Sequence, residues 1–275
     1  MQTVITPLRD ELPADPHALP AEWASWAEEP GHLVSVEEEG QVLGRVHVVV
    51  VGRDEAWLEG LWVAPSARGR GVARRLVAAA EEVARRYGTG VVRTAVPRHD
   101  YAATAVAERA GFQRTCDAIV LVTGVPAGPL ESPFEAPVVP AVEADVPTLI
   151  AMLGAAPVLA AWRGLVPLGW RFRRLVPELV RGLVKDGRVL RAGDPPEGTA
   201  AFAVRGTDAV VSWVTGMAAH QQALFAAIAE RARAAGAGRV AVFAPDARAV
   251  DGVRVAFTPH PWCPDGMLVV EKRLA

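Results

Sequence analysis

The segment Leu61–Ala73 constrains this chain more than any other, because a hydrophobic strand passes into a short loop of arginine and glycine and then into a helix. Gly69 and Gly71 let the backbone approach a ligand with no Cβ in the way. The first N–H groups of the helix converge on one point, and the helix dipole favours negative charge there. Arg68 and Arg70 add charge-assisted donors suited to phosphate. The segment therefore predicts a pyrophosphate-binding cradle between a strand and a helix.

The residues on either side of this loop support the interpretation. A strand is expected over Trp57–Val63, and a helix over Arg70–Tyr87 that ends at Gly88, a residue typical of the position after a helix. Pairs of glutamate and arginine four residues apart support the exposed face of the helix. The apolar residues recur at helical spacing: Val72, Ala73, Leu76, Val77, Ala80, Val83, Ala84 and Tyr87.

The pattern Arg68-x-x-Gly71-x-Ala73, between this strand and this helix, strongly resembles the GNAT superfamily of acetyl-CoA-dependent N-acetyltransferases. The resemblance implies that the loop holds the pyrophosphate of acetyl-CoA, which is the co-substrate, and that no metal is needed. It implies transfer of an acetyl group to a primary amine without an acyl-enzyme. The cofactor-binding residues expected from the resemblance are Leu61, Trp62, Val63, Arg68, Gly69, Arg70, Gly71, Val72, Ala73, Asp100 and Ala103.

A second segment, from His99 through Gly111-Phe112, resembles another stretch of the same family. Asp100 takes the position of an asparagine that touches CoA in the family, and Ala103 matches. The tyrosine that usually serves as general acid falls on Ala107, which has no hydroxyl. Tyr101 is a candidate acid, although it is expected on a different face of the helix and could equally be a packed aromatic residue. Thr104 lies nearer the face of Ala107, about one turn back, and water could also protonate the thiolate.

The resemblance also implies that the central strand splays from its neighbour near Leu61–Val63 and exposes backbone amides. The Val63 N–H is then the candidate donor to the acetyl oxygen. Glu59 is the candidate general base and is expected on the same strand face as Val63, beside Trp57. Apolar surroundings would raise the pKa of its carboxyl, which suits a base near neutral pH. The alternative is an ordinary solvated strand residue.

An internal repeat indicates two tandem domains. The strand before Pro97 resembles the strand before Pro245, which lies 148 residues later in the chain. The same offset of 148 residues aligns Gly88 with Gly236 and Val63 with Val211. We expect a GNAT domain over residues 1–127, a Pro/Gly-rich linker over 128–136, and a degenerate GNAT-like domain over 137–275. The predicted fold class is α/β, with each domain a mixed, mostly antiparallel twisted sheet flanked by helices.

The second copy is expected to lack the pyrophosphate loop. The offset replaces Arg68–Ala73 by the segment 216–221, which has no arginine. The domain would then serve as scaffold, as a wall of the acceptor site or as a pseudo-dimer partner. His220 could be a ligand or a base, but a polar residue in the first helical turn is the simpler interpretation. The basic stretch from Trp162 to Lys185 is expected to be a helical section with solvated arginines, the alternative being a surface for an anionic ligand or a membrane.

The remaining elements of the first copy follow from apolar patterning and turn residues. We expect a Glu39-Gly40 turn between two strands, and a helix that ends at Gly111. The expected strands are Thr3–Leu8, Leu33–Glu38, Val42–Val51, Ala56–Val63, Gly90–Ala95 and Phe112–Val122, and the other expected helices are a short one near Ala18–Ala27 and Tyr101–Ala110.

Composition narrows the partners. The chain has 275 residues, and its hydrophobic content of 51% indicates a globular protein with an ample core. Its net charge of −2 argues against bulk attraction to nucleic acid or to an anionic membrane. Cys116 and Cys263 are the only cysteines, and with no signal peptide we expect a cytoplasmic protein. The acceptor is expected to be a small-molecule or peptide amine, with Trp23, Trp26, Trp57 and Trp62 as possible wall residues. The chain is expected to be a monomeric pseudo-dimer or a homodimer. A non-catalytic acyl-CoA-binding protein remains the alternative.

Overall fold

The computed structural model describes residues 1–7, 31–131 and 137–274. The helix predicted near Ala18–Ala27, and with it Trp23 and Trp26, lies outside the described residues. The chain forms two compact units. The first comprises residues 1–96, 100–114 and 270–275, and the second comprises residues 97–99 and 115–269.

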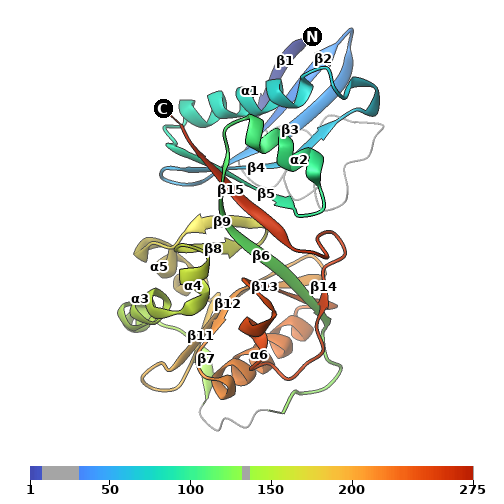
Figure 1. Ribbon diagram of the computed structural model, residues 1–275. Coiled ribbons are helices and arrows are strands. Elements are labelled where there is room, and N and C mark those ends of the chain that lie inside the picture. Colours follow the sequence, from blue (N-terminus) through green and yellow to red (C-terminus); the bar gives the residue numbers. More distant parts are fainter. Residues whose placement is uncertain (8–30, 132–136, 275) are drawn as a thin grey trace. The chain divides into compact units, whose positions relative to one another are not determined.

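The first unit is a twisted sheet with helices, as Figure 1 shows. The strand order is β1-β2-β3-β4-β5, followed by the last residues of β15. The β1–β2, β2–β3 and β3–β4 pairs are antiparallel, and the β4–β5 pair is parallel. The elements are β1 Gln2–Pro7, β2 His32–Glu38, β3 Gln41–Gly52, β4 Glu55–Val63, the 3-10 turn η2 Pro65–Ala67, α1 Val72–Arg86, β5 Val91–Pro97, α2 Tyr101–Arg109, and the residues of β15 Met267–Arg273 that lie in this unit.

Local sequence accounts for the hairpin and the main helix of this unit. Glu39 and Gly40, between β2 and β3, have φ of 52° and 79°, so the turn matches the right-handed twist of the strands that it joins. Helix α1 buries its apolar face, including Leu76 and Ala80, against the sheet. A Cβ added at Gly44 would lie 2.9 Å from Val72 Cγ1, so the missing side chain lets the helix approach β3 closely.

The second unit has its own sheet, in the order β6-β13-β12-β11-β10-β7, with β14 beside β6 and a separate β8–β9 hairpin. The β12–β13 pair is parallel, as the β4–β5 pair is in the first unit. The elements are β6 Gln113–Gly124, β7 Val138–Pro140, η3 Glu143–Asp145, α3 Val146–Ala155, α4 Pro157–Ala161, β8 Leu165–Leu168, β9 Arg171–Arg174, α5 Pro177–Lys185, β10 Val189–Ala192, β11 Gly198–Arg205, β12 Asp208–Thr215, α6 Ala218–Ala234, β13 Arg239–Ala244, η4 Ala247–Val250 and β14 Thr258–Pro259.

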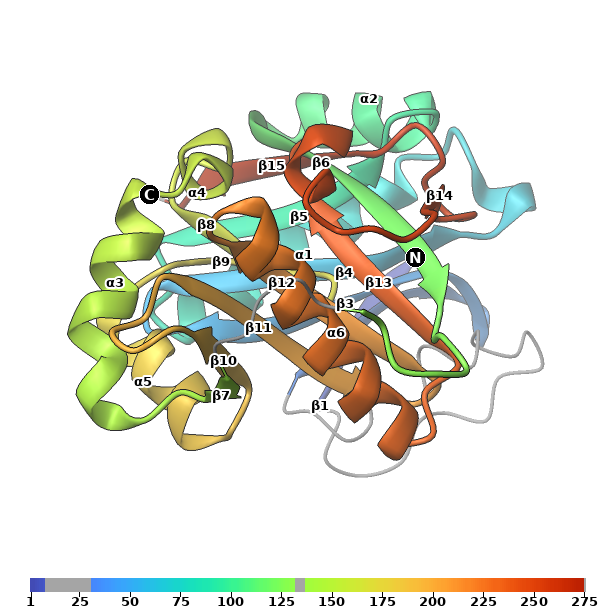
Figure 2. The same cartoon turned by 90° about the horizontal axis from the view of Figure 1, so that it is seen from below.

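Helices cover both faces of the second sheet. Leu224, Phe225 and Ile228 of α6 pack with Phe202 and Val211 of the sheet in one core. A second core joins residues of α3 and α5 with Ala201 and Trp213. Because neighbouring strand residues point to opposite faces, the two cores lie on opposite sides of β11 and β12. Figure 2 shows α6 lying across these strands.

The repeat is visible in the structure but does not keep one offset throughout. Gly88 and Gly236 follow the corresponding helices with φ of 73° and 75°, which agrees with the offset of 148. The strand before each helix does not agree with this offset. Glu55 pairs with Val91, and Asp208 pairs with Arg239. Val91 and Arg239 are 148 residues apart, but Glu55 and Asp208 are farther apart than that. The alignment of Val63 with Val211 is therefore wrong, because the second copy has a shorter connection between this strand and the helix.

The boundary between the two units falls within two strands. Strands β6 and β15 each run from one unit into the other, so that the end of the chain returns to the first unit. The predicted division into residues 1–127, 128–136 and 137–275 follows the repeat, and it differs from this spatial grouping at both strands. The helical section predicted over residues 162–185 is wrong in its middle, where β8 and β9 form a hairpin with Trp170 in its turn.

Candidate active site

The Arg/Gly loop, residues 68–73, follows the 3-10 turn η2 and leads into α1. Ala67 is buried at the base of the loop and donates its N–H to the Ala64 carbonyl at 2.8 Å. Gly69 and Gly71 have φ of 77° and 79°, a region that side chains disfavour. An added Cβ would meet nothing within 4 Å at either glycine, so the loop backbone borders open space. The loop thus fits a bulky anion at the helix N-terminus.

The two arginines of the loop take different partners. Arg68 Nε donates to the Val63 carbonyl at 3.4 Å, which ties the loop to the end of β4. Arg70 Nη2 lies 2.7 Å from Glu38 Oε2, at the end of β2. The hydrogen bond from Arg70 lowers the pKa of the Glu38 carboxyl. The Glu38 carboxylate is therefore paired with one of the two guanidinium groups that the loop is predicted to offer to an anion.

The central strands separate next to this loop. The parallel ladder between β4 and β5 ends at the pair Trp57–Arg93, although β4 continues to Val63. On the other edge of β4, Ala64 donates its N–H to the Leu43 carbonyl at 2.9 Å. In the alternation of an antiparallel ladder, the neighbouring pair Gly44–Val63 is then not hydrogen-bonded, and the amide groups of Val63 point away from β3. The Val63 N–H thus faces the gap left by β5.

A β-bulge lies between Glu59 and the end of β4. Arg45 pairs with Trp62 and His47 pairs with Glu59, so β4 has one residue more than β3 between these pairs. Gly60, at the bulge, has a φ of 63°. The extra residue puts Glu59 and Trp62 on one face of the sheet and Val63 on the other. The prediction that Glu59 and Val63 share a face is therefore wrong, and the bulge is the reason.

Glu59 is held by a buried histidine. Its Oε1 lies 2.8 Å from Nδ1 of His47, whose side chain is fully buried, while the Glu59 side chain is 14% exposed. Trp62 lies on the same face, with the Arg45 guanidinium 5.3 Å from its ring centroid. Glu59 is thus a largely buried carboxylate with a specific partner, and its role as general base stays a prediction.

The second predicted segment is organised around a helix cap. Asp100 Oδ1 accepts a hydrogen bond of 2.9 Å from the Ala103 N–H at the start of α2, so this carboxylate satisfies the helix terminus. Tyr101 is 82% exposed, and it is not a packed aromatic residue. Ala107 is buried in α2 and brings no hydroxyl there. The positions of Asp100 and Ala103 toward CoA, and the role of Tyr101 as acid, stay predictions.

The corresponding place in the second unit has a different build. Only Gly216 and Met217 separate β12 from α6, whereas residues 64–71 separate β4 from α1. A Cβ at Gly216 would lie 2.9 Å from Gly198 Cα and from His220 Cβ, so this turn packs against protein rather than open space. The His220 side chain is buried, with Nε2 3.4 Å from Glu197 Oε2.

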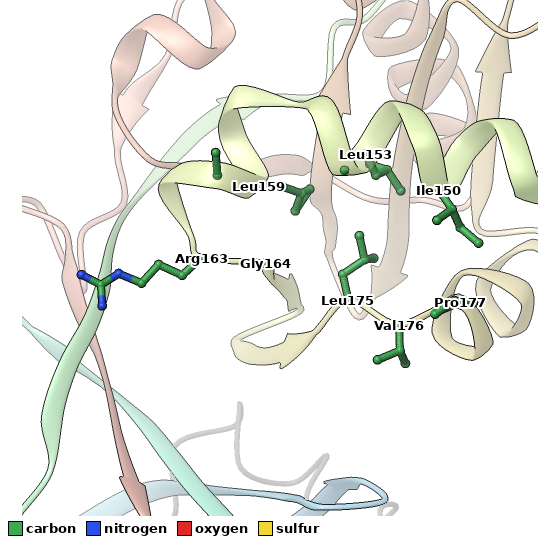
Figure 3. A pocket seen from close by; sticks show the side chains of 10 residues that line it. Ile150, Leu153, Leu159, Arg163, Gly164, Leu175, Val176 and Pro177 are labelled. Carbon is green, nitrogen blue, oxygen red and sulfur yellow. The ribbon is translucent and has the colours of Figure 1, made fainter.

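A cavity of about 410 Å³ lies elsewhere in the second unit, between α3, α4 and the start of α5. Figure 3 shows its apolar lining, which includes Ile150, Leu153, Leu159 and Leu175, and shows the Arg163 side chain extending away from these residues. The lining offers no carboxylate or imidazole for proton transfer. The candidate site is therefore the Arg/Gly loop with β4.

Two residues of this region escaped the sequence reasoning, His47 and Glu38. Alternation along β3 places Arg45 and His47 on one face, but the sequence does not say which strand residue lies opposite. Glu38 belongs to the run Glu37–Glu39, which resembles a solvated hairpin tip. In the described residues, no three His, Cys, Asp or Glu side chains are grouped to hold a metal ion. Over the same ranges, no helix is long and apolar enough to cross a membrane.

Part of the chain matches a known protein family. Residues 4–112 match the model of the Acetyltransferase (GNAT) family. No curated protein matches the chain. Among solved structures, a GCN5-related N-acetyltransferase from Sphaerobacter thermophilus has a TM-score of 0.59 at 15% identity, over 88% of this chain and 80% of that one.

Two further structures are similar in fold over most of the chain. A putative acetyltransferase from Thermoplasma acidophilum has a TM-score of 0.52 at 13% identity, over 88% of this chain and 78% of that one. A structure described as a tandem GNAT protein from the clavulanic acid biosynthesis pathway has a TM-score of 0.53 at 16% identity, over 88% of this chain and 82% of that one. The fold-class prediction of a mixed α/β protein with the tandem GNAT fold is confirmed.

Proposed function

Residues 4–112 belong to the GNAT acetyltransferase family, whose members transfer an acyl group from acyl-CoA to an amine, and we propose that this chain transfers an acetyl group from acetyl-CoA to a primary amine. The observation that carries the proposal is the gap beside β4. There the Val63 N–H faces away from β3, next to a loop whose glycines border open space. An extended acyl-CoA arm can enter such a gap as an added strand, with its phosphates at the loop.

The Arg/Gly loop would bind the pyrophosphate. The N-terminal amides of α1 and the guanidinium groups of Arg68 and Arg70 supply donors, and Gly69 and Gly71 leave room for the ligand. Leu61 and Trp62 would flank the pantetheine arm on β4, and Val72 and Ala73 would present the first turn of α1. Asp100 and Ala103 would border the arm from α2. Each of these assignments follows the family motif.

The chemical step needs a base and an oxyanion donor. Glu59 would take the proton that the amine loses, and the amine nitrogen then forms a bond to the thioester carbonyl carbon while the carbon–sulfur bond breaks. The Val63 N–H would donate to the carbonyl oxygen, on which negative charge develops in the transition state. One such donor lowers the barrier by about 3–4 kcal/mol. The electron pair of the broken bond leaves on the CoA sulfur as a thiolate.

The helix position at which the family carries its general-acid tyrosine has no hydroxyl here, which favours a second candidate function. Ala107 replaces the family tyrosine, and Tyr101 is an exposed residue at the first turn of α2. A non-catalytic acyl-CoA-binding protein would need the loop and the gap but no acid. An active enzyme would protonate the thiolate with water or with Tyr101.

Release of free CoA thiol separates the two functions. Acetyl-CoA is incubated with a panel of primary amines, for example benzylamine, spermidine, glucosamine and a short peptide, and thiol is measured over time. Amine-dependent release that falls in Glu59→Gln supports the enzyme. Tight acetyl-CoA binding with no release for any amine supports the binding protein. A small-molecule or peptide acceptor is then identified from the panel.

Binding of CoA itself tests the loop. We expect Arg68→Ala and Arg70→Ala each to weaken CoA binding about tenfold, because each removes a charge-assisted hydrogen bond. Arg86→Ala is the matched control, since this exposed arginine lies at the far end of α1. Equal affinity of all three variants, measured by calorimetry, would contradict the loop assignment.

The second unit is proposed to be a degenerate copy that does not bind CoA. Its short turn at Gly216 is packed against protein, so it lacks both the arginines and the space of the first loop. It would serve as scaffold, as a wall of the acceptor site or as a pseudo-dimer partner, in a cytoplasmic monomer or homodimer. Calorimetry with CoA should give one site per chain.

A further inference from the structure

His47 lies between two contacts that define where its ring sits. On one side, Nδ1 is 2.8 Å from Glu59 Oε1. On the other side lies Gly31, where an added Cβ would come within 2.1 Å of His47 Nε2 and 3.0 Å of the Val48 carbonyl oxygen. The imidazole is fully buried in β3. A side chain at position 31 would therefore overlap the His47 ring in its present position.

The contact with Glu59 determines which nitrogen carries a proton. An ionised carboxylate can only accept a hydrogen bond, so in the ionised form of Glu59 it is Nδ1 of His47 that donates to Oε1. This donation holds one carboxylate oxygen of Glu59 in place. It also stabilises the charged form of Glu59, the form that a general base needs.

We propose that His47 is a positioning residue that orients Glu59 and keeps it ionised for proton abstraction, with Gly31 providing the space for the ring. The inference rests on the proposed function, because Glu59 is the base assigned there. It extends that function to a residue on another strand, which does not belong to the loop motif.

Apolar and charged residues of the described strands border the pair. From β2, the residue opposite His47 is the apolar Leu33. Arg45 lies two residues away on β3, over the Trp62 ring. The charged residues farther along this face are engaged with other side chains: Arg93 of β5 with Glu55 of β4 and Glu271 of β15, and Glu37 with Ser35 on β2.

The pH dependence of kcat/KM for acetyl transfer is the main test, with the best amine of the panel as probe. Loss of the donor in His47→Leu should raise the pKa of the base, so the acidic limb of the profile should move up by about one pH unit. We expect kcat at neutral pH to fall about tenfold, with the affinity for acetyl-CoA unchanged. His47→Asn, whose side-chain amide can occupy the place of Nδ1–H, should return the limb toward its original position.

Two further variants separate positioning from folding. Gly31→Ala leaves His47 chemically intact but displaces it, so it should shift the limb in the same direction as His47→Leu. His32→Leu is the matched control, because the His32 ring contacts Tyr87 and its loss should leave the profile unchanged. Circular dichroism and acetyl-CoA binding establish that each variant is folded. An acidic limb that stays in place in a folded His47→Leu protein would overturn the proposal.

A spectroscopic measurement keeps this inference distinct from the proposed function. Two-bond nitrogen–proton NMR correlations of the His47 ring should show a proton on Nδ1 in the wild-type protein. Glu59→Leu should weaken this preference. If the wild-type protein acetylates no amine, the enzymatic function fails while the spectra still decide the His47–Glu59 contact. A wild-type ring protonated only on Nε2 would overturn the inference even in an active enzyme.

Discussion

Arg70 of the predicted pyrophosphate loop is paired with Glu38, with Nη2 and Oε2 2.7 Å apart. The N-terminal amine lies 3.7 Å from the other oxygen of the same carboxylate. The pairing joins the end of β2 to a loop that lies 32 residues later in the chain. An anion that enters the loop must compete with this carboxylate for the guanidinium group of Arg70 and must approach a negative charge.

We therefore expect Glu38→Gln to tighten CoA binding about two- to fivefold, a modest change because the pair is exposed to solvent. The low pKa of Glu38 keeps its carboxylate charged from about pH 6 to about pH 8, so the gain should be constant over this range. Calorimetry with CoA measures it, and the gain should shrink at high salt. Glu39→Gln, at the hairpin turn, is the control for net charge. Weaker binding in Glu38→Gln would mean that Glu38 orients Arg70 for the ligand.

Gly71 and Gly40 allow a matched test of the loop backbone. Both have a φ of 79°, and an added Cβ would meet nothing within 4 Å at either residue. Alanine at either position should therefore cost a similar free energy of unfolding, about 1 kcal/mol. Only Gly71→Ala should weaken CoA binding, because only its methyl group would project at the predicted phosphate site. Equal CoA affinity in the two variants would place the ligand elsewhere.

Arg93 forms the buried ionic centre of the first unit. Its side chain is 1% exposed and contacts Glu55 Oε1 at 2.7 Å and Glu271 Oε2 at 2.9 Å. Arg93→Met would leave two largely buried carboxylates without their counter-ion, so we expect a loss of about 3–5 kcal/mol in the free energy of unfolding. Urea denaturation followed by circular dichroism measures the loss.

Two variants give this stability prediction its controls. Adding Glu271→Gln to Arg93→Met should recover part of the loss, because one uncompensated charge is removed. Arg86→Ala breaks an exposed pair with Glu82 and should change stability little. A loss in Arg93→Met no larger than that in Arg86→Ala would show that the buried pairs do not stabilise the unit.

Cys263 should be an unreactive thiol. The residue is 1% exposed, and burial raises its pKa to about 11. At about pH 8 the reactive thiolate is then a small fraction of the population, so Ellman's reagent should label Cys263 slowly in the folded protein. Cys116 is buried as well, and it provides an internal comparison. Rapid labelling of both thiols is expected only in urea, and rapid labelling of Cys263 in buffer would contradict the burial.

The helices and turns that are specified by residues close together in the chain could be predicted from the sequence. The spacing of apolar residues and the terminal glycines predicted α1 within a few residues, and the Glu39-Gly40 dipeptide predicted the turn between β2 and β3. These features are local, because a turn or an amphipathic helix is encoded within one stretch of chain. The exception was the segment 162–185, where a hairpin over residues 165–174 stands before the helix α5.

The relationships between distant strands did not follow from the sequence. The bulge that turns Val63 to the other face, the His47–Glu59 contact and the partnership of Arg93 with Glu271 all depend on register or on residues far away in the chain. A shift of one residue in a ladder reverses every later side chain, and nothing local records it. The shortened turn at Gly216 was likewise hidden, because an ungapped offset matches helices and glycines without showing which strand residues pair.

The sequence by itself determined the motif, the helix that follows it and the repetition of the unit, because each is written in spacing along one segment. Only the tertiary structure decided how those parts become a site. It separated β4 from β5 beyond Trp57, placed Glu38 on Arg70 and set a buried histidine against Glu59. The physical reason is that strand pairing brings together residues whose separation along the chain carries no information about their contact.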